Sequence, residues 1–121
     1  MSSSNTAINI LLFCLADSDA EQLVTHCRRG GRIAHTFGID TGEKLAAAIC
    51  DSDWDVLIFD AEQSQLDIQR CCHILRKYHK DIPVIYVGEG DVLQPPDPDV
   101  VDMINKYNMA QIVNAAFKAQ S

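Results

Sequence analysis

The sequence has no apolar run long enough to cross a bilayer. Its longest apolar stretch, residues 10–16, is far shorter than the roughly 20 residues of a membrane-spanning helix. No basic region precedes this stretch, as a secretory signal peptide would require. We therefore expect a cytoplasmic protein.

Cysteine pairs of the C-x-x-C type, which mark zinc and redox sites, are also missing. The five cysteines form an odd set: Cys14, Cys27, Cys50, Cys71 and Cys72. Because free cysteine behaves as a small apolar side chain, we expect reduced thiols that are mostly buried.

Positive charge is scarce. Ten Lys and Arg residues against 17 Asp and Glu residues give a formal net charge of −7. This excess of negative charge opposes the phosphate backbone of nucleic acids and the surface of anionic membranes. We expect neither nucleic acid nor a membrane among the partners.

The composition is that of one folded domain. A chain of 121 residues can bury a sufficient core without disulfides or metal. Its 47% hydrophobic and 22% charged residues are typical of soluble globular proteins. We expect a disordered N-terminal segment, residues 1–7, followed by a single domain over residues 8–121.

Three short apolar segments have the pattern of strands that are buried on both faces. They are residues 8–14, 56–59 and 84–87, each rich in β-branched or aromatic side chains. Residues 33–37 predict a weaker strand, and residues 100–104 predict a fifth strand at an edge.

Amphipathic helices are predicted between these strands and after the last. Ser18 with Glu21 indicates a capping box at the start of the first helix, which Gly30 and Gly31 end. The other helices are predicted to start at Asp40, Ser64 and Asn108. The expected core-facing residues are Ala20, Leu23, Val24 and Cys27; Leu45, Ala48 and Ile49; Ile68, Cys71, Cys72 and Leu75; and Met109, Ile112, Val113, Ala116 and Phe117.

Buried strands that alternate with amphipathic helices predict a doubly wound parallel sheet of the α/β class. The functional crevice of such a sheet lies beyond the carboxyl ends of the strands, here at residues 14–19, 60–63 and 88–91. The connection from residue 87 to residue 100 is short for a helical crossover and carries Pro95, Pro96 and Pro98. We therefore expect a fourth helix that is shortened or absent.

The run Trp-Asp-Val-Leu-Ile-Phe-Asp at residues 54–60 is similar to the third strand of receiver domains from bacterial two-component response regulators. That strand ends in the phosphate-accepting aspartate, and Asp60 takes its position. Residues 82–87 resemble the family's P-V-I-x-L strand, and Leu66-Asp67 falls where the family has its M-D-G turn. The resemblance covers essentially the whole chain and implies a five-stranded flavodoxin-like fold with strand order 2-1-3-4-5.

The sequence departs from this resemblance at several functional positions. The two acidic residues that follow the first strand in receivers are replaced by Cys14 and Leu15. The family's Thr or Ser after strand four is replaced by Gly88. Lys106 matches the lysine after strand five, although a slightly earlier register would place Met103 there.

These departures remove the chemistry of phosphorylation. A carboxylate that attacks a phosphate needs a divalent cation to neutralise both groups. Magnesium requires several oxygen ligands, which the thiol of Cys14 and the hydrocarbon of Leu15 do not supply. Gly88 also lacks the hydroxyl that would reorient toward a phosphoryl group. We therefore expect no resident cofactor, no catalytic residue and no enzymatic activity.

Asp17 keeps a second interpretation open. If it turned toward Asp60, the two carboxylates could rebuild a partial Mg²⁺ site, and the chain would be a functional phosphoacceptor of a two-component phosphorelay. The simpler interpretation makes Asp17 a solvated turn residue. It makes Asp60 a strand-end carboxylate that accepts hydrogen bonds and is not phosphorylated.

Two other motifs carry weaker signals. Gly88-Glu89-Gly90 could belong to a flavin or nucleotide site, but it lacks the full G-x-G-x-x-G. Cys71-Cys72-His73 cannot share one metal ion, because consecutive helical residues point in different directions.

The leading hypothesis is a degenerate receiver domain in bacterial signal transduction that acts by protein–protein interaction or dimerisation. Degenerate receivers of this kind resemble the N-terminal modules of multidomain signalling proteins, such as the GGDEF and EAL proteins of cyclic-di-GMP signalling. The expected partner is another protein, a second copy, or an output domain in the same or another polypeptide. The expected interaction surface is formed by the last two strands and the last helix, where a missing fourth helix would expose apolar side chains. Its candidate residues are Val100, Met103, Tyr107 and Met109.

Overall fold

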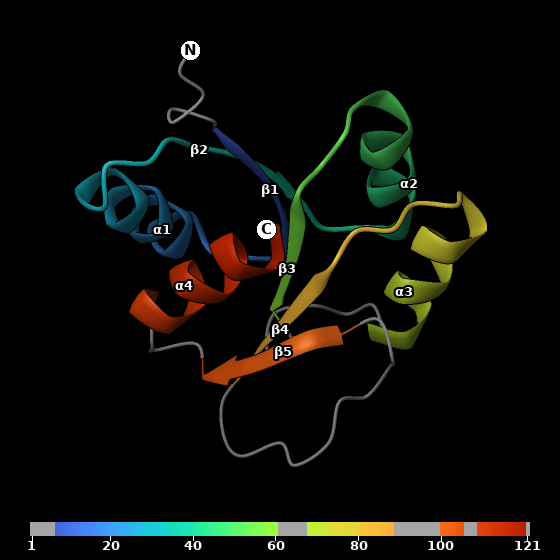
Figure 1. Ribbon diagram of the computed structural model, residues 1–121. Coiled ribbons are helices and arrows are strands. Elements are labelled where there is room, and N and C mark those ends of the chain that lie inside the picture. Colours follow the sequence, from blue (N-terminus) through green and yellow to red (C-terminus); the bar gives the residue numbers. More distant parts are fainter. Residues whose placement is uncertain (1–6, 61–67, 89–99, 106–108, 121) are drawn as a thin grey trace.

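A five-stranded parallel sheet with helices on both faces forms the computed structural model, which describes residues 7–60, 68–88, 100–105 and 109–120 (Figure 1). The strands are β1 (Ile8–Phe13), β2 (Ala34–Ile39), β3 (Val56–Asp60), β4 (Val84–Gly88) and β5 (Val100–Asn105). The helices are α1 (Asp17–Arg29), α2 (Gly42–Asp51), α3 (Ile68–Lys77) and α4 (Met109–Gln120). Helices α1 and α4 cover one face of the sheet, and α2 and α3 cover the other.

The strand order is β2-β1-β3-β4-β5, which confirms the predicted doubly wound topology. Phe13 is level with Phe59, and Asp60 is level with Val87, so the carboxyl ends of the three central strands meet at one end of the sheet. The connection predicted to hold a shortened or absent fourth helix, residues 89–99, lies outside the described residues. So does most of the segment predicted to be disordered, residues 1–6.

Two apolar cores are separated by the sheet. The α2/α3 core contains Leu11 and Phe13 of β1 with Leu57 and Phe59 of β3. The α1/α4 core contains the residues that alternate with them, such as Ile58. Each fully buried Leu or Ile side chain contributes about 1.5–3 kcal/mol through its removal from water. The central strands are therefore stabilised from both faces, as their continuous apolar pattern predicted.

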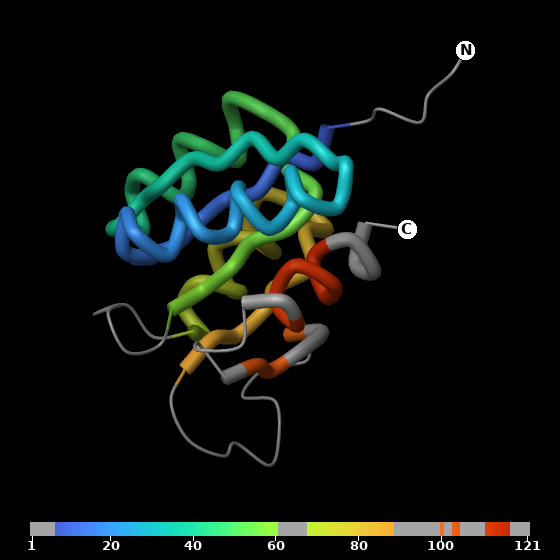
Figure 2. The backbone as a smooth tube through the Cα atoms, turned by 90° about the vertical axis from the view of Figure 1, so that its left-hand side faces the viewer, coloured from blue at the N-terminus to red at the C-terminus, as the bar shows by residue number. Residues whose placement is uncertain are grey.

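The predicted inner faces of the helices are confirmed where the structure describes them. The buried members are Leu23, Cys27, Leu45, Ala48, Ile49, Ile68, Cys71, Cys72, Leu75, Ile112 and Ala116. Ala20, Val24 and Val113 are half-buried. The side chains of Met109 and Phe117 lie outside the described part of the chain. Helices α1 and α4 lie next to each other (Figure 2). Leu23, Ile112 and Ala116 belong to the core that these two helices form with the sheet.

The predicted capping box of the first helix is wrong. Helix α1 begins at Asp17, and its N-cap is Ala16, which makes no side-chain hydrogen bond. The N–H of Ala20 already donates to the Ala16 carbonyl at 3.0 Å, so Ser18 lies inside the first turn. The turn that follows β1 is short, and it therefore brings the chain into the helix earlier than the Ser18 pattern indicated.

The start of the second helix was also predicted one residue too early. Thr41 is the N-cap of α2, and its hydroxyl accepts from the Lys44 N–H at 3.1 Å. Asp40 instead forms an exposed ion pair of 2.9 Å with the Lys44 ammonium. The predicted openings at Ser64 and Asn108 lie outside the described residues.

The predicted end of the first helix is confirmed. Gly30 is the C-cap of α1, and the next residue, Gly31, has a φ of 76°, a left-handed conformation that glycine adopts without steric cost.

All five cysteines are free thiols. Most of them are buried, as expected: Cys27, Cys71 and Cys72 are buried, Cys14 is half-buried, and Cys50 is exposed. Cys50 is exposed because it lies on the outer side of α2, one residue after the core-facing Ile49. No helix in the described ranges is both long and apolar enough to span a membrane.

Candidate functional site

Asp60 is the last residue of β3 and lies at the end of the sheet where the topology predicts the functional crevice. Its exposed fraction is 1%, and it is the only charged residue among the buried residues that the structure describes. A buried carboxylate is costly unless it is paired or hydrogen-bonded. Asp60 does interact with other groups, and no buried side-chain oxygen or nitrogen in the described ranges lacks a hydrogen-bond partner.

A row of aromatic rings lies directly beneath this crevice on the α2/α3 face. Phe13 stacks on Phe59 with ring centroids 5.4 Å apart, and Phe59 stacks on Tyr86 at 6.1 Å. These contacts tie β1, β3 and β4 together just before their carboxyl ends. This row was not predicted from the sequence, although Phe13 and Phe59 directly precede Cys14 and Asp60.

Cys14 follows β1 in a left-handed conformation, with a φ of 62°. Its N–H donates to the Ile39 carbonyl at 2.8 Å, and its Sγ lies 3.8 Å from the Asp40 carbonyl oxygen. Both partners come from the end of β2 and the residue after it. Because β2 and β3 flank β1 on opposite sides, the thiol is directed toward β2, on the side of β1 away from Asp60.

Leu15 is half-buried and packs against the α1/α4 core. Side chains alternate between the two faces along a strand. Ile58 belongs to the α1/α4 core, so Asp60, two residues further along β3, falls on the same face. Leu15 therefore supplies hydrocarbon on the face of the sheet that Asp60 shares.

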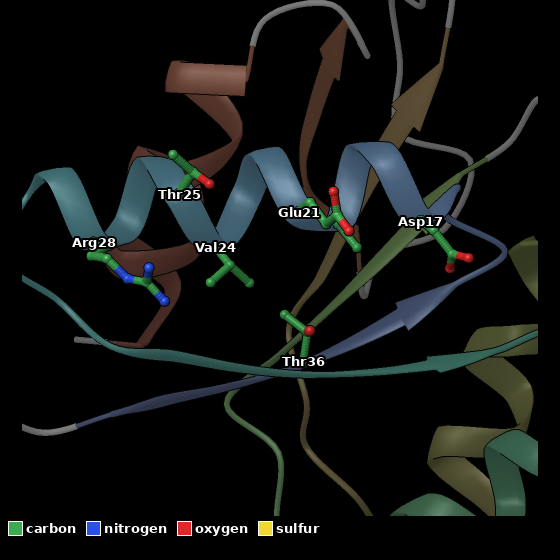
Figure 3. Close-up of a pocket in the computed structure, with 7 residues that line it drawn as sticks. Asp17, Glu21, Val24, Thr25, Arg28 and Thr36 are labelled. Atoms are coloured by element: carbon green, nitrogen blue, oxygen red, sulfur yellow. The ribbon is translucent and has the colours of Figure 1, made fainter.

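Asp17, the first residue of α1, lines a groove on the outer flank of that helix (Figure 3). The groove has a volume of about 520 Å³, and Thr36 of β2 forms part of its wall. Its lining residues are Asp17, Ala20, Glu21, Val24, Thr25, Arg28 and Thr36. Asp17 thus contributes to a groove at the β2 edge, which lies across β1 from Asp60.

The described residues do not fit a magnesium ion. Among them, no group of three or more His, Cys, Asp or Glu side chains could hold a metal. At the crevice, Asp60 offers a carboxylate, while Cys14 and Leu15 offer sulfur and hydrocarbon. Magnesium prefers near-octahedral oxygen ligands, so this set of donors is unsuitable.

The two predicted switch positions follow the neighbouring strands. Gly88 is the buried last residue of β4 and is level with Asn105 of β5. Lys106, the next residue, lies outside the described part. Met103 is level with Tyr86 and packs against the α2/α3 core. It therefore lies two residues before the end of β5.

Of the candidate residues for the interaction surface on the last two strands and the last helix, Val100 was wrongly expected to be exposed. Val100 is only 5% exposed, because it belongs to the α2/α3 core, and Met103 is partly buried against the same core. Tyr107 and the side chain of Met109 lie outside the described residues, as do Glu89 and Gly90 of the glycine motif.

No protein-family model matches the sequence, and no curated protein matches it. Several solved structures are similar. The receiver domain of the Francisella response regulator 1452 superposes with a TM-score of 0.66 at 20% identity, covering 94% of this chain and 99% of its own. A chain in the complex of histidine kinase ThkA with response regulator protein TrrA gives a TM-score of 0.70 at 19% identity, with coverage of 94% and 99%.

A third similar structure is the N-terminal domain of a response regulator/sensory box/GGDEF 3-domain protein from Carboxydothermus hydrogenoformans. Its TM-score is 0.66 at 13% identity, covering 93% of this chain and 92% of its own. At such identities the likeness establishes the fold. The chain therefore has the five-stranded flavodoxin-like fold of response regulator receiver domains.

Proposed function

We propose that this chain is a degenerate receiver domain in bacterial signal transduction, which acts by binding protein partners with little or no phosphorylation of Asp60. Its fold supports this assignment. Among the similar structures, one is a kinase–response regulator complex and another is the N-terminal domain of a multidomain protein. Partner proteins and covalently linked output domains are thus both represented among proteins of this fold.

The observation that carries the proposal is the placement of Cys14 and Leu15. The thiol of Cys14 is directed toward the end of β2, and Leu15 packs into the α1/α4 core. Neither residue offers an oxygen to a cation beside Asp60. Because phosphoryl transfer to a carboxylate depends on charge neutralisation, a site without a cation cradle is a poor phosphoacceptor.

The second half of the usual switch is also missing. Gly88 ends β4 where receivers carry a hydroxyl, and it has no side chain that could follow a phosphoryl group. Modification of Asp60 would therefore have no hydroxyl at Gly88 through which to act. The domain would then act by binding protein partners through surfaces that are present without phosphorylation.

The alternative is a phosphoacceptor in which Asp17 and Asp60 hold Mg²⁺, and the groove that Asp17 lines does not support it. Asp17 lines the groove beside Thr36, and β1 separates β2 from β3.

Incubation with Mg²⁺ and acetyl phosphate, followed by intact-mass spectrometry, tests the proposal. We expect the mass of the wild-type protein to stay unchanged and its melting temperature to be unaffected by Mg²⁺ with beryllium fluoride. The matched control is Asp60→Asn, which removes the nucleophile and keeps the side-chain size. A phosphoryl adduct in the wild type that is absent from Asp60→Asn would contradict the proposal.

Two further variants test the placement of the side chains. Leu15→Asp puts a carboxylate on the face shared with Asp60, whereas Cys14→Asp puts one toward β2. We expect Mg²⁺ to raise the melting temperature of Leu15→Asp more than that of Cys14→Asp. The reverse order would show that Cys14, and not Leu15, faces the phosphoacceptor position.

A further inference from the structure

β2 is an edge strand whose outward backbone groups are covered by no other strand in the described sheet. The N–H of Ile8 donates to the Ile33 carbonyl at 2.9 Å, and Cys14 donates to the Ile39 carbonyl at 2.8 Å. Carbonyls at these odd positions therefore point toward β1. Because backbone groups alternate sides along a strand, those at residues 34, 36 and 38 point outward.

This edge lacks the features by which proteins usually block edge-to-edge pairing. The six residues of β2, Ala-His-Thr-Phe-Gly-Ile, include no lysine, proline or carboxylate, and their register with β1 is unbroken. A Cβ added to Gly38 would meet nothing within 4 Å, so the strand is open to approach.

Two large apolar side chains are exposed at this edge, one in β2 and one directly before it. Ile33 is 54% exposed and Phe37 is 51% exposed. Phe37 stacks on Trp54 with ring centroids 6.0 Å apart, which orients its ring although half of it faces solvent. Because side chains alternate between the two faces along a strand, Ile33 and Phe37, which are four residues apart, lie on the same face.

The groove between α1 and β2 is self-complementary in charge. Asp17 and Glu21 line one end of it, and Arg28 lines the other (Figure 3). If a second α1 ran antiparallel to the first, with the axis between residues 22 and 23, position 17 would face position 28 of the other copy. Position 21 would then face Val24, so that each acidic end meets the basic end of its partner.

We propose that a second copy of this chain binds here, by antiparallel pairing of the two β2 strands around a two-fold axis at His35. This register places Phe37 opposite Ile33 of the second copy and Thr36 opposite Ala34, and it pairs the outward backbone groups. In Figure 3, Thr36 lies beneath the middle of α1, between Arg28 and Asp17. A single two-fold axis can therefore relate both the two β2 strands and the two α1 helices.

A second copy is favoured over an unrelated protein because two features of this surface are self-complementary. They are the apolar residues of the β2 edge and the charges along α1. An isologous two-fold contact requires such self-complementarity. The proposed function requires a protein partner, and this interface names one, a second copy of the chain. The signalling role of the dimer rests on that proposed function. Its formation needs nothing from Asp60, so the dimer and the phosphorylation-independent function can fail separately.

Sedimentation velocity and amide hydrogen exchange of the wild-type chain, over a range of concentrations, test the proposal. We expect a monomer–dimer equilibrium. The amides of Ala34, Thr36 and Gly38 should gain protection as concentration rises, while those of His35 and Phe37 stay protected throughout by β1. Trp54 is the only tryptophan and should change its fluorescence with the same concentration dependence.

Phe37→Lys should weaken the dimer by about tenfold or more, since it places a charge opposite Ile33 twice in each dimer. The matched control is Tyr78→Lys, at a large apolar side chain that is 38% exposed at the end of α3, and it should leave the dimer unchanged. Arg28→Glu should weaken the dimer, and the double variant Asp17→Arg with Arg28→Glu should restore it.

A chain that stays monomeric at every concentration overturns the proposal. So does a dimer in which the outward β2 amides gain no protection. If Phe37→Lys fails to fold, the exchange pattern of the wild type and the charge-reversal pair decide the matter without it.

Discussion

Cys14 is the residue at which the chain departs from the alternation of β1. Its φ of 62° is unusual for a residue other than glycine and costs on the order of 1–3 kcal/mol unless its surroundings compensate. The hydrogen bond from its N–H to Ile39 provides part of that compensation. As a result, Cys14 packs against the α2/α3 core and Leu15 against the opposite one, which decides which residue shares a face with Asp60.

The cysteines differ enough in environment to be separated by their reactivity. Burial raises the pKa of the Cys27 thiol above its ordinary value, and the nearby Arg32 only partly offsets this effect. Cys27 therefore remains a thiol at a pH that ionises ordinary cysteines, and its burial also shields it from reagents. Cys50, in contrast, is exposed to solvent. Since the thiolate is the reactive form, we expect iodoacetamide at pH 8 to alkylate Cys50 first.

Peptide mass spectrometry over time measures this order directly. Cys50→Ser should remove the fast reaction and leave the slow ones unchanged. Alkylation of Cys27 in the native protein at the same rate as Cys50 would contradict the burial that the structure assigns to it.

At the scale of elements, the starts of α1 and α2, whose caps the structure describes, show what local sequence can and cannot specify. Ser18 with Glu21, and Asp40 with Glu43, both match capping patterns, yet the caps are Ala16 and Thr41. Several polar residues near each start satisfy the same pattern. The choice among them is made by where the preceding strand ends and how tightly the chain turns.

These helix starts predict opposite outcomes for two similar substitutions. Thr41→Ala removes the hydroxyl that accepts from the Lys44 N–H, and we expect a loss of about 0.5–2 kcal/mol in the free energy of unfolding. Ser18→Ala changes a residue inside the first turn and should stay within about 0.5 kcal/mol of wild type. Urea denaturation measures both, and a larger loss for Ser18→Ala would mean that the capping box forms in solution.

The same contrast explains how much of the fold and site the sequence could predict. The three central strands were predicted because they are buried on both faces, which leaves an almost continuous apolar run. The bounds of β2 were shifted because only one of its six residues is buried, which leaves no clear hydrophobic period. At the site, the position of Asp60 followed from the topology, whereas the directions of Cys14 and Leu15 depended on a backbone conformation that cysteine does not signal.

At the scale of the whole molecule, the two cores are parts of one structure. Adjacent residues of β3, such as Leu57 and Ile58, point into opposite cores and share one backbone. Loss of either core would leave one face of the same strand exposed to water. The sheet therefore couples the α1/α4 side to the α2/α3 side, and we expect both to unfold together.

Truncation of either residue tests this coupling. Leu57→Ala and Ile58→Ala should each lower the free energy of unfolding by about 2–5 kcal/mol, because both create a cavity at a fully buried position. Trp54 packs against the α2/α3 core and reports on that side alone through its fluorescence. If the molecule unfolds as one unit, Ile58→Ala, on the other side, shifts the Trp54 transition as far as the helical circular dichroism signal.

Lys44→Ala is the matched control, because its side chain is 63% exposed and its ion pair with Asp40 is worth at most about 1 kcal/mol. It should shift both signals slightly and equally. Separate midpoints for fluorescence and circular dichroism in Ile58→Ala would mean that the α1/α4 side unfolds first. The shared backbone of β3 would then be too weak a link to make the domain cooperative.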